Sequence, residues 1–215
     1  AEQNELESYS LTVTNQTLDS LKKSETLANV VIKTNLGTVT VAKGALDEIA
    51  SQADINDKDI VLEFAKNTTI NYLYYSFNTT IDGQKLYINE NQPVNISVPY
   101  TTPRRGKKIQ VSSSEGAGGL DYVYESEELS WSSGTSGKYQ ISEVDREPFE
   151  VWTKDNEKVG VYANFSKAYN ACNSDQKIVM VVSGALVNGY SNGNLGDVFE
   201  EKSEGVLLEI PEGVT

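Results

Sequence analysis

The chain has 215 residues, 38% of them hydrophobic and 9% aromatic, which is enough for one large packed domain or two small ones. A net charge of −13 disfavours nucleic acid and anionic lipid headgroups as partners. The sequence has no histidine and one cysteine, which excludes Ser-His-Asp and Cys-His catalytic sets, intrachain disulfides and cysteine-rich zinc sites. Carboxylate-pair chemistry of the glycosidase kind remains compatible with this composition.

The first quarter of the chain combines strand and helix patterns. Residues 9–14 alternate like a half-buried strand, and residues 15–23 carry leucines three positions apart, as on one helical face. Residues 28–34 and 38–41 flank an Asn-Leu-Gly turn and predict a β-hairpin. Apolar residues at helical spacing within residues 42–53 predict a second amphipathic helix.

The remaining sequence is a succession of short strand and turn patterns. A spacing of roughly ten residues between strands is typical of a sandwich or barrel rather than of βαβ units. The predicted fold class is therefore mainly β, antiparallel and sandwich-like, with two short helices in the N-terminal quarter. No apolar run reaches membrane-spanning length. Strands are expected at residues 60–64, 71–80, 85–88, 93–99, 108–111, 121–124, 138–142, 149–152, 158–162, 177–182 and 206–210.

Three segments of the first hundred residues form a recognisable set. They are SLTV with LDSL in residues 10–21, VIKTNLGTVTV in residues 31–41 leading into ALDEIA, and YSF, IDGQK and PVNISVPY in residues 75–100. Over residues 9–100 the chain thereby resembles a β-rich module of secreted Gram-positive cell-surface proteins, of the kind found near S-layer-homology repeats. The resemblance implies a structural or adhesive role rather than catalysis.

The second half departs from this module. Family members continue into a short strand pair and end in a strand with a His-Phe-Ser-like motif. Residues 151–159 echo the strand pair, but the histidine is absent and residues 104–147 look inserted. We expect a surface-protein-like module over residues 1–102. A β-rich, loop-rich region over residues 103–215 then packs either separately or as one domain with the first.

A basic cluster follows Pro103 in this acidic chain. It consists of Arg104, Arg105, Lys107 and Lys108. These side chains are candidates for docking on an acidic wall polymer or an acidic neighbouring subunit, and the alternative is a solvated turn.

Three aromatic residues are candidates for ligand contact. Trp131, Tyr139 and Trp152 can supply flat apolar faces that stack on sugar rings, and the alternative is ordinary packing of a β-rich core. Because this region also holds the basic cluster and Gly/Ser/Asn-rich loops, we expect any binding site to lie between residues 104 and 196.

Oxygen-bearing side chains are concentrated at the end of the second predicted helix. Asp54, Asn56, Asp57 and Asp59 form a weak calcium candidate. Their spacing does not follow the EF-hand pattern, because Lys58 occupies the fifth position and the sixth is not glycine. A turn that ends the helix is the alternative.

These observations predict a non-enzymatic structural or adhesion module of a secreted, extracellular bacterial cell-surface protein, without a cofactor. Its expected partners are other surface-protein domains, cell-wall polymer, or an extracellular glycan or protein ligand. Two alternatives remain open: a carbohydrate-binding module, and a structural subunit of a virion or filament.

Overall fold

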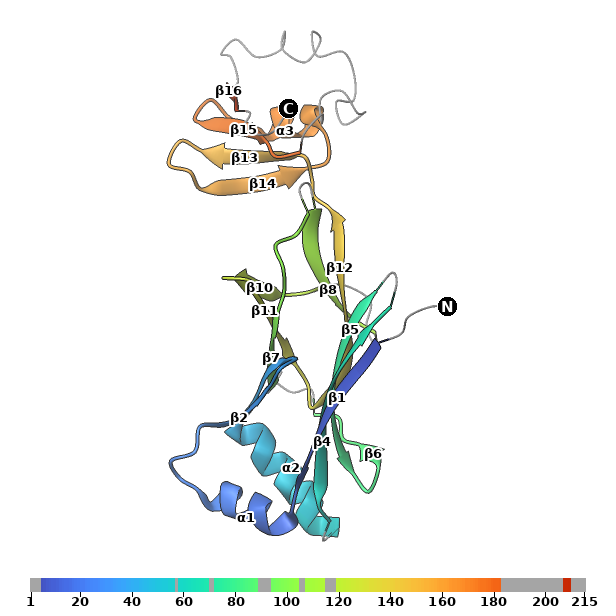
Figure 1. Cartoon of the computed structure of the whole chain (residues 1–215). Coiled ribbons are helices and arrows are strands. Elements are labelled where there is room, and N and C mark those ends of the chain that lie inside the picture. The colour runs from blue at the N-terminus through green and yellow to red at the C-terminus, as the bar shows by residue number, and fades with distance from the viewer. Residues whose placement is uncertain are drawn as a thin grey trace. The chain divides into compact units, whose positions relative to one another are not determined.

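The computed structural model describes residues 5–56, 58–69, 72–88, 94–104, 107–114, 119–182 and 207–209. In this part the chain is mainly β-strand, in largely antiparallel sheets, with three helices (Figure 1). It divides into two compact units, each with its own hydrophobic core. Unit 1 is Ala1–Thr102 with Ile109–Ser142, and unit 2 is Pro103–Lys108 with Glu143–Thr215.

Sheet A has the strand order β1-β4-β5-β12-β8-β9, with β6 beside β5. Tyr75 of β5 is paired with Tyr139 of β12, so residues distant in sequence complete one sheet. The strands are β1 (Glu5–Val13), β4 (Ile60–Thr68), β5 (Leu73–Ile81), β6 (Gln84–Lys85), β8 (Lys107–Ser113), β9 (Gly119–Leu120) and β12 (Ser136–Asp145).

Sheet B lies in unit 1 and has the order β10-β11-β7-β3-β2, with every neighbouring pair antiparallel. Gly37 begins β3 with a φ of 146°, and a Cβ there would lie 2.3 Å from the carbonyl oxygen of Ser97. Glycine is therefore required where β3 meets β7. The strands are β2 (Asn29–Thr34), β3 (Gly37–Ala42), β7 (Val94–Pro99), β10 (Tyr122–Glu125) and β11 (Glu128–Ser133).

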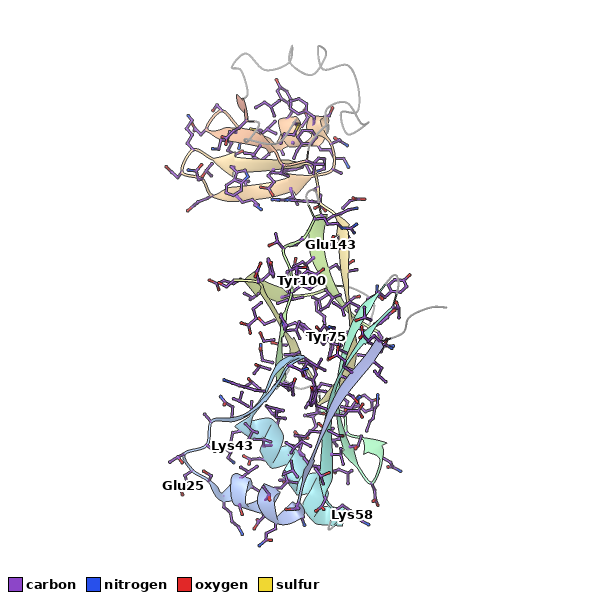
Figure 2. All side chains as sticks on the ribbon, in the orientation of Figure 1. Glu25, Lys43, Lys58, Tyr75, Tyr100 and Glu143 are labelled. Carbon is purple, nitrogen blue, oxygen red and sulfur yellow. The ribbon has the colours of Figure 1, made fainter. Side chains whose placement is uncertain are left out.

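Helices α1 (Asn15–Lys23) and α2 (Lys43–Asn56) lie side by side in unit 1 (Figure 1). Leu18 of α1 and Ile49 of α2 are buried in the same core as the inward residues of both sheets. Tyr75, labelled in Figure 2, is buried in that core and stacks on Phe64, with ring centres 6.0 Å apart. This packed scaffold fixes the strands of sheet B.

Unit 2 is a smaller sheet with the order β14-β13-β15-β16, accompanied by α3. The Asn164 side chain caps α3 by accepting the Lys167 amide. Phe149 and Phe165 pack edge to face in the core of this unit, with ring centres 5.6 Å apart. The elements are β13 (Phe149–Thr153), β14 (Lys158–Tyr162), α3 (Phe165–Ala171), β15 (Gln176–Met180) and β16 (Leu207–Glu209).

The predicted mainly β class is confirmed, but the expected confinement of helices to the N-terminal quarter is wrong, because α3 lies between β14 and β15. Phe165, Ala168, Tyr169 and Cys172 are spaced i, i+3, i+4 and i+7, and all are buried. The pair β15–β16 is parallel, in contrast to the antiparallel pattern expected. Strands from beyond residue 103 also pair with strands of the first hundred residues.

In the part of the chain that the structure describes, no helix has the length and apolar character needed to cross a bilayer.

Candidate functional site

Sheet B presents two chemically different faces. Along β3 and β7, inward Val39 and Ile96 are fully buried, whereas Thr38, Asn95 and Ser97 point outward between them. The strand β11 continues this pattern, with alternate residues buried. The outward face is therefore held in place by a close-packed apolar layer behind it.

A continuous row of side chains crosses all five strands on the outward face. Lys33 lies directly opposite Thr38, Thr38 opposite Ser97, Ser97 opposite Ser130, and Ser130 opposite Val123. We call these five residues the sheet B row. Directly opposed residues have neighbouring side chains, so the three hydroxyl groups in the centre of the row form one polar strip.

A second row runs beside the first. Val31, Thr40, Asn95 and Ser132 are opposed in the same way across β2, β3, β7 and β11. Val31 in this row and Val123 in the sheet B row are 47% and 61% exposed, and both lie on the outermost strands of sheet B. The face thus has a polar centre with an exposed valine at each edge.

The face is hollowed, with a volume of about 570 Å³, and all five residues of the sheet B row line the hollow. Its rim is the β10–β11 hairpin, where Glu125 lies directly opposite Glu128. The turn residues Ser126 and Glu127 have φ values of 52° and 61°, in the left-handed region that non-glycine residues rarely adopt. The Ser97 hydroxyl donates to the Glu128 carboxylate, which links the rim to the centre of the row.

The side chains that line the hollow are suited to binding a ligand through hydrogen bonds. Serine and threonine hydroxyls both donate and accept hydrogen bonds, and the asparagine amide does the same. One lysine and two carboxylates stand at the margins. Among the described residues, no group of three or more acidic or cysteine side chains is placed to hold a metal ion.

The basic cluster is engaged in ion pairs within unit 2. The hydrogen bond from Lys108 lowers the pKa of Glu147, and the neighbouring positive charges act in the same direction. Arg105 lies outside the described residues. The pairs are Arg104 with Glu143 (2.7 Å), Lys107 with Asp145 (2.6 Å) and Lys108 with Glu147 (2.7 Å).

Two of the three aromatic residues that were predicted to contact a ligand are buried in unit 1. Trp131 is 2% exposed and Tyr139 is 5% exposed, and their rings pack together with centres 5.6 Å apart. The Tyr139 hydroxyl is also hydrogen-bonded to the Ser133 hydroxyl. These rings pack in the core and offer little surface to a ligand.

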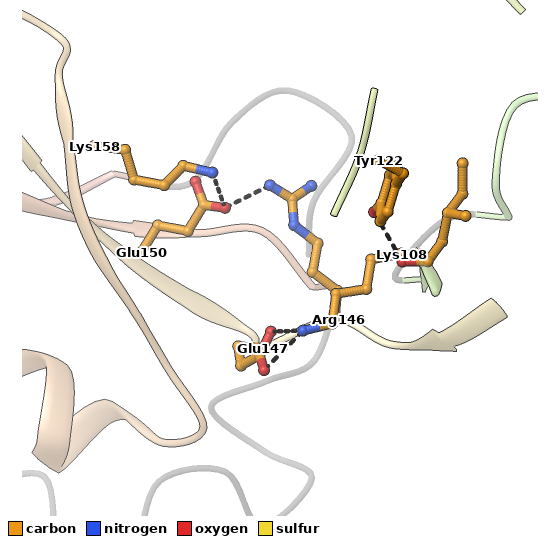
Figure 3. Close-up of polar contacts among 7 residues, drawn as sticks. Lys108, Tyr122, Arg146, Glu147, Glu150 and Lys158 are labelled. Carbon is orange, nitrogen blue, oxygen red and sulfur yellow. Dashed lines mark hydrogen bonds and ion pairs between the residues drawn. The ribbon is translucent and has the colours of Figure 1, made fainter. Parts of the chain in front are cut away.

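Trp152 belongs to a polar cluster in unit 2 around the buried carboxylate of Glu150, whose ion pairs with Arg146 and Lys158 are shown in Figure 3. Arg146 and Lys158 donate to this carboxylate at 2.5 and 2.9 Å, and Trp152 Nε1 donates to its other oxygen at 2.9 Å. Burial raises the pKa of Glu150, but the hydrogen bonds and charges of Arg146 and Lys158 outweigh burial and lower it. The three donors of this cluster satisfy the hydrogen-bonding needs of the Glu150 carboxylate, and the cluster stabilises unit 2.

Asp59 is the one residue of the weak calcium candidate whose side chain is described, and it has a structural role. Asp59 Oδ1 accepts the backbone amide of Asn15 at 2.9 Å, at the start of α1. Asp54 and Asn56 lie in the last turn of α2, their side chains are outside the described set, and Asp57 is outside the described residues. Asp59 thus joins α1 to the start of β4.

The residues of the hollow were not singled out by sequence reasoning. Lys33, Thr38, Thr40, Asn95, Ser97 and Val123 fall in predicted strands without a role, because a single strand with outward Ser or Thr looks like any solvated strand. Glu125, Ser126, Glu128 and Ser130 lie between the strands predicted at residues 121–124 and 138–142. The available signal was repetition: β3, β7 and β11 each carry small polar residues at alternate positions. The row becomes visible only when the pairing order of the strands is known.

The chain matches no protein-family model, and comparisons with curated proteins and with solved structures find no match.

Proposed function

We propose that this chain is a non-enzymatic structural or adhesion module of a secreted bacterial cell-surface protein. In this proposal the two sheets of unit 1 form a sandwich-like scaffold, and the outward face of sheet B is the contact surface. The observation that carries the proposal is the hollow lined by the sheet B row. The module acts outside the cell through protein–protein or protein–polymer contacts.

Charge chemistry supports binding rather than catalysis. The described cations of the basic cluster are all bonded to carboxylates, and the buried Glu150 is bonded to two cations. Such pairs stabilise a fold and do not present an acid and a base to a substrate. The sequence has no histidine to serve as a general base near neutral pH.

The test is retention on purified Gram-positive cell walls in a pelleting assay. The parent is expected to be retained, and Thr40→Arg with Ser130→Arg is expected to abolish retention because these side chains fill the hollow. Ser76→Arg with Thr80→Arg, on the outward face of sheet A, is the matched control and is expected to be retained. A parent that is not retained on the walls, or equal loss in both variants, contradicts the proposal.

A second candidate function, a subunit of a larger assembly, is favoured by the edge strand β1. Among the described residues β1 pairs with β4 alone, and its Leu6, Tyr9 and Leu11 are 67%, 42% and 45% exposed. An exposed edge with apolar side chains is a template for pairing with another strand. Concentration-dependent growth in light scattering, abolished by Leu6→Lys with Ser10→Lys, would favour this candidate.

A further inference from the structure

We infer that the hollow on sheet B binds a neutral, hydroxyl-rich oligomer, a glycan chain of several sugar units that lies across the strands along the sheet B row. This inference rests on the proposed function, since it names the ligand class of the proposed contact surface.

The centre of the hollow matches the hydrogen bonding of sugars. Thr38, Ser97, Ser130 and Thr40 place hydroxyl groups there, and Asn95 adds an amide. The Thr38, Thr40 and Ser130 hydroxyls and the Asn95 amide can both donate and accept, as each sugar hydroxyl can, whereas Ser97 donates to Glu128 and is left as an acceptor. The packed apolar layer behind β3 and β7 holds the strands that carry them, so a ligand does not have to order a loop.

One edge of the hollow matches the apolar part of such a chain. Val123 lines the hollow at one end of the sheet B row and is exposed on an outermost strand, where an antiparallel sheet with one solvated face usually carries polar residues. The C–H faces of sugar rings are apolar, and Val123 lies where one end of a bound chain would contact the protein.

Charge selects a neutral ligand over an anionic one. Glu125 and Glu128 are directly opposed at the rim, an arrangement that is unfavourable in a sheet, and Lys33 stands at the opposite end of the row. The chain as a whole carries a net charge of −13. A polyphosphate or polycarboxylate would be repelled, whereas the rim carboxylates can accept hydrogen bonds from sugar hydroxyls.

The sheet also disfavours an extended peptide in the hollow. β3, β7 and β11 are each paired on both sides, so their backbone groups are already used in the ladders. A peptide here would find no backbone partner for its own N–H and C=O groups, unlike a peptide added at a sheet edge.

The length of the row sets the size of the ligand. Five strands span four inter-strand spacings of about 4.8 Å, or roughly 19 Å from Lys33 to Val123. A single sugar covers only part of this distance. Affinity is therefore expected to rise with oligomer length until the row is covered.

The experiment is calorimetric titration of the full chain with two neutral series, gluco-oligosaccharides and β-linked N-acetylglucosamine oligosaccharides, each from monosaccharide to octasaccharide. Thr38→Val with Ser97→Ala removes two hydroxyls from the row with little change of shape. Thr80→Val with Ser76→Ala makes the same chemical change on the outward face of sheet A. Polyglutamate and polyphosphate are the anionic probes.

Binding in at least one neutral series is expected to rise with length, to weaken about tenfold or more in the row variant, and to be unchanged in the control. Lack of binding in both neutral series, preference for an anionic probe, or equal effects of both variants overturns the inference. If none of these oligomers binds while the parent is retained on walls through the hollow, the ligand class is wrong and the proposed function stands. If wall retention also fails, the proposed function fails as well.

Discussion

At the scale of single residues, the two tryptophan side chains have different structural roles in the two units. Trp131 is enclosed in the core of unit 1, whereas Trp152 is partly exposed and donates to Glu150. The sequence predicted a strand at Trp152 and none at Trp131, and it could not show which of the two rings faced inward. That distinction depends on the pairing partners Ile96 and Tyr122, which fix the orientation of Trp131.

Trp131→Ala is expected to destabilise the protein by about 3–5 kcal/mol, because it removes a large buried side chain from a close-packed core. Trp131→Phe is expected to cost much less, since the indole N–H has no hydrogen-bond partner among the residues that the structure describes. Urea unfolding followed by circular dichroism measures both. An alanine variant within about 1 kcal/mol of the parent would contradict the placement of Trp131.

Glu150→Gln is expected to destabilise unit 2 by about 1–2 kcal/mol at pH 7, because it removes the charge that Arg146 and Lys158 surround. These two cations are partly exposed, which keeps the loss below the roughly 3–5 kcal/mol that breaking a fully buried pair costs. The glutamine oxygen can still accept from Trp152, but its amide NH2 then faces the Arg146 and Lys158 donors, so the variant removes the charge together with these two hydrogen bonds.

The effect of Glu150→Gln is also expected to depend on pH. The pKa of Glu150 is lowered in the fold, so its stabilising contribution is complete above the unfolded value of about 4.3 and disappears as the pH falls through the folded value. Urea midpoints of parent and variant should differ at pH 7 and converge as the pH falls below the unfolded value. A difference that is constant with pH would show that the carboxylate charge is not responsible.

At the scale of elements, local patterns predicted the first quarter well. The helices predicted at residues 15–23 and 42–53 correspond to α1 (Asn15–Lys23) and α2 (Lys43–Asn56), and the hairpin predicted at residues 28–41 corresponds to β2 and β3. In these segments hydrophobic spacing and turn chemistry agree with the final packing. α3 and β11 were missed, although Phe165 to Cys172 has helical spacing and Leu129 to Ser133 alternates. Short elements between stronger strand patterns give a weak signal.

Asp59→Ala is expected to destabilise the protein by about 1 kcal/mol, because the first backbone amide of α1 loses its acceptor. Calcium should neither stabilise the parent by more than a small amount nor restore the variant. Thermal unfolding with and without millimolar calcium tests both statements. A rise of many degrees in the parent's melting temperature, lost in Asp59→Ala, would instead support a calcium site.

At the scale of the whole molecule, the main gap between sequence and structure is long-range pairing. Local reasoning placed a boundary near residue 102, whereas unit 1 also includes Ile109–Ser142. Those residues pair with β5 and β7, strands that precede them by many positions. Pairing between strands so far apart in the sequence cannot be predicted from a short stretch of residues. The hollow on sheet B depends on this long-range pairing.

The pairing also distributes the proposed contact surface over both halves of the sequence, whereas binding was expected between residues 104 and 196. The sheet B row draws Lys33, Thr38 and Ser97 from the first hundred residues and Ser130 and Val123 from beyond them. Neither half of the sequence contains the hollow alone. The basic cluster and Trp131, which directed attention to the second half, have partners within the fold.

The central claim is that the outward face of sheet B is the contact surface, and amide NMR of the isotope-labelled chain titrated with solubilised cell-wall fragments tests it most directly. Shift changes are expected to concentrate at Thr38, Thr40, Asn95, Ser97 and Ser130. The outward residues Ser76 and Thr80 of sheet A should be unaffected. Changes concentrated on sheet A or in unit 2, with the sheet B row unaffected, would contradict the claim.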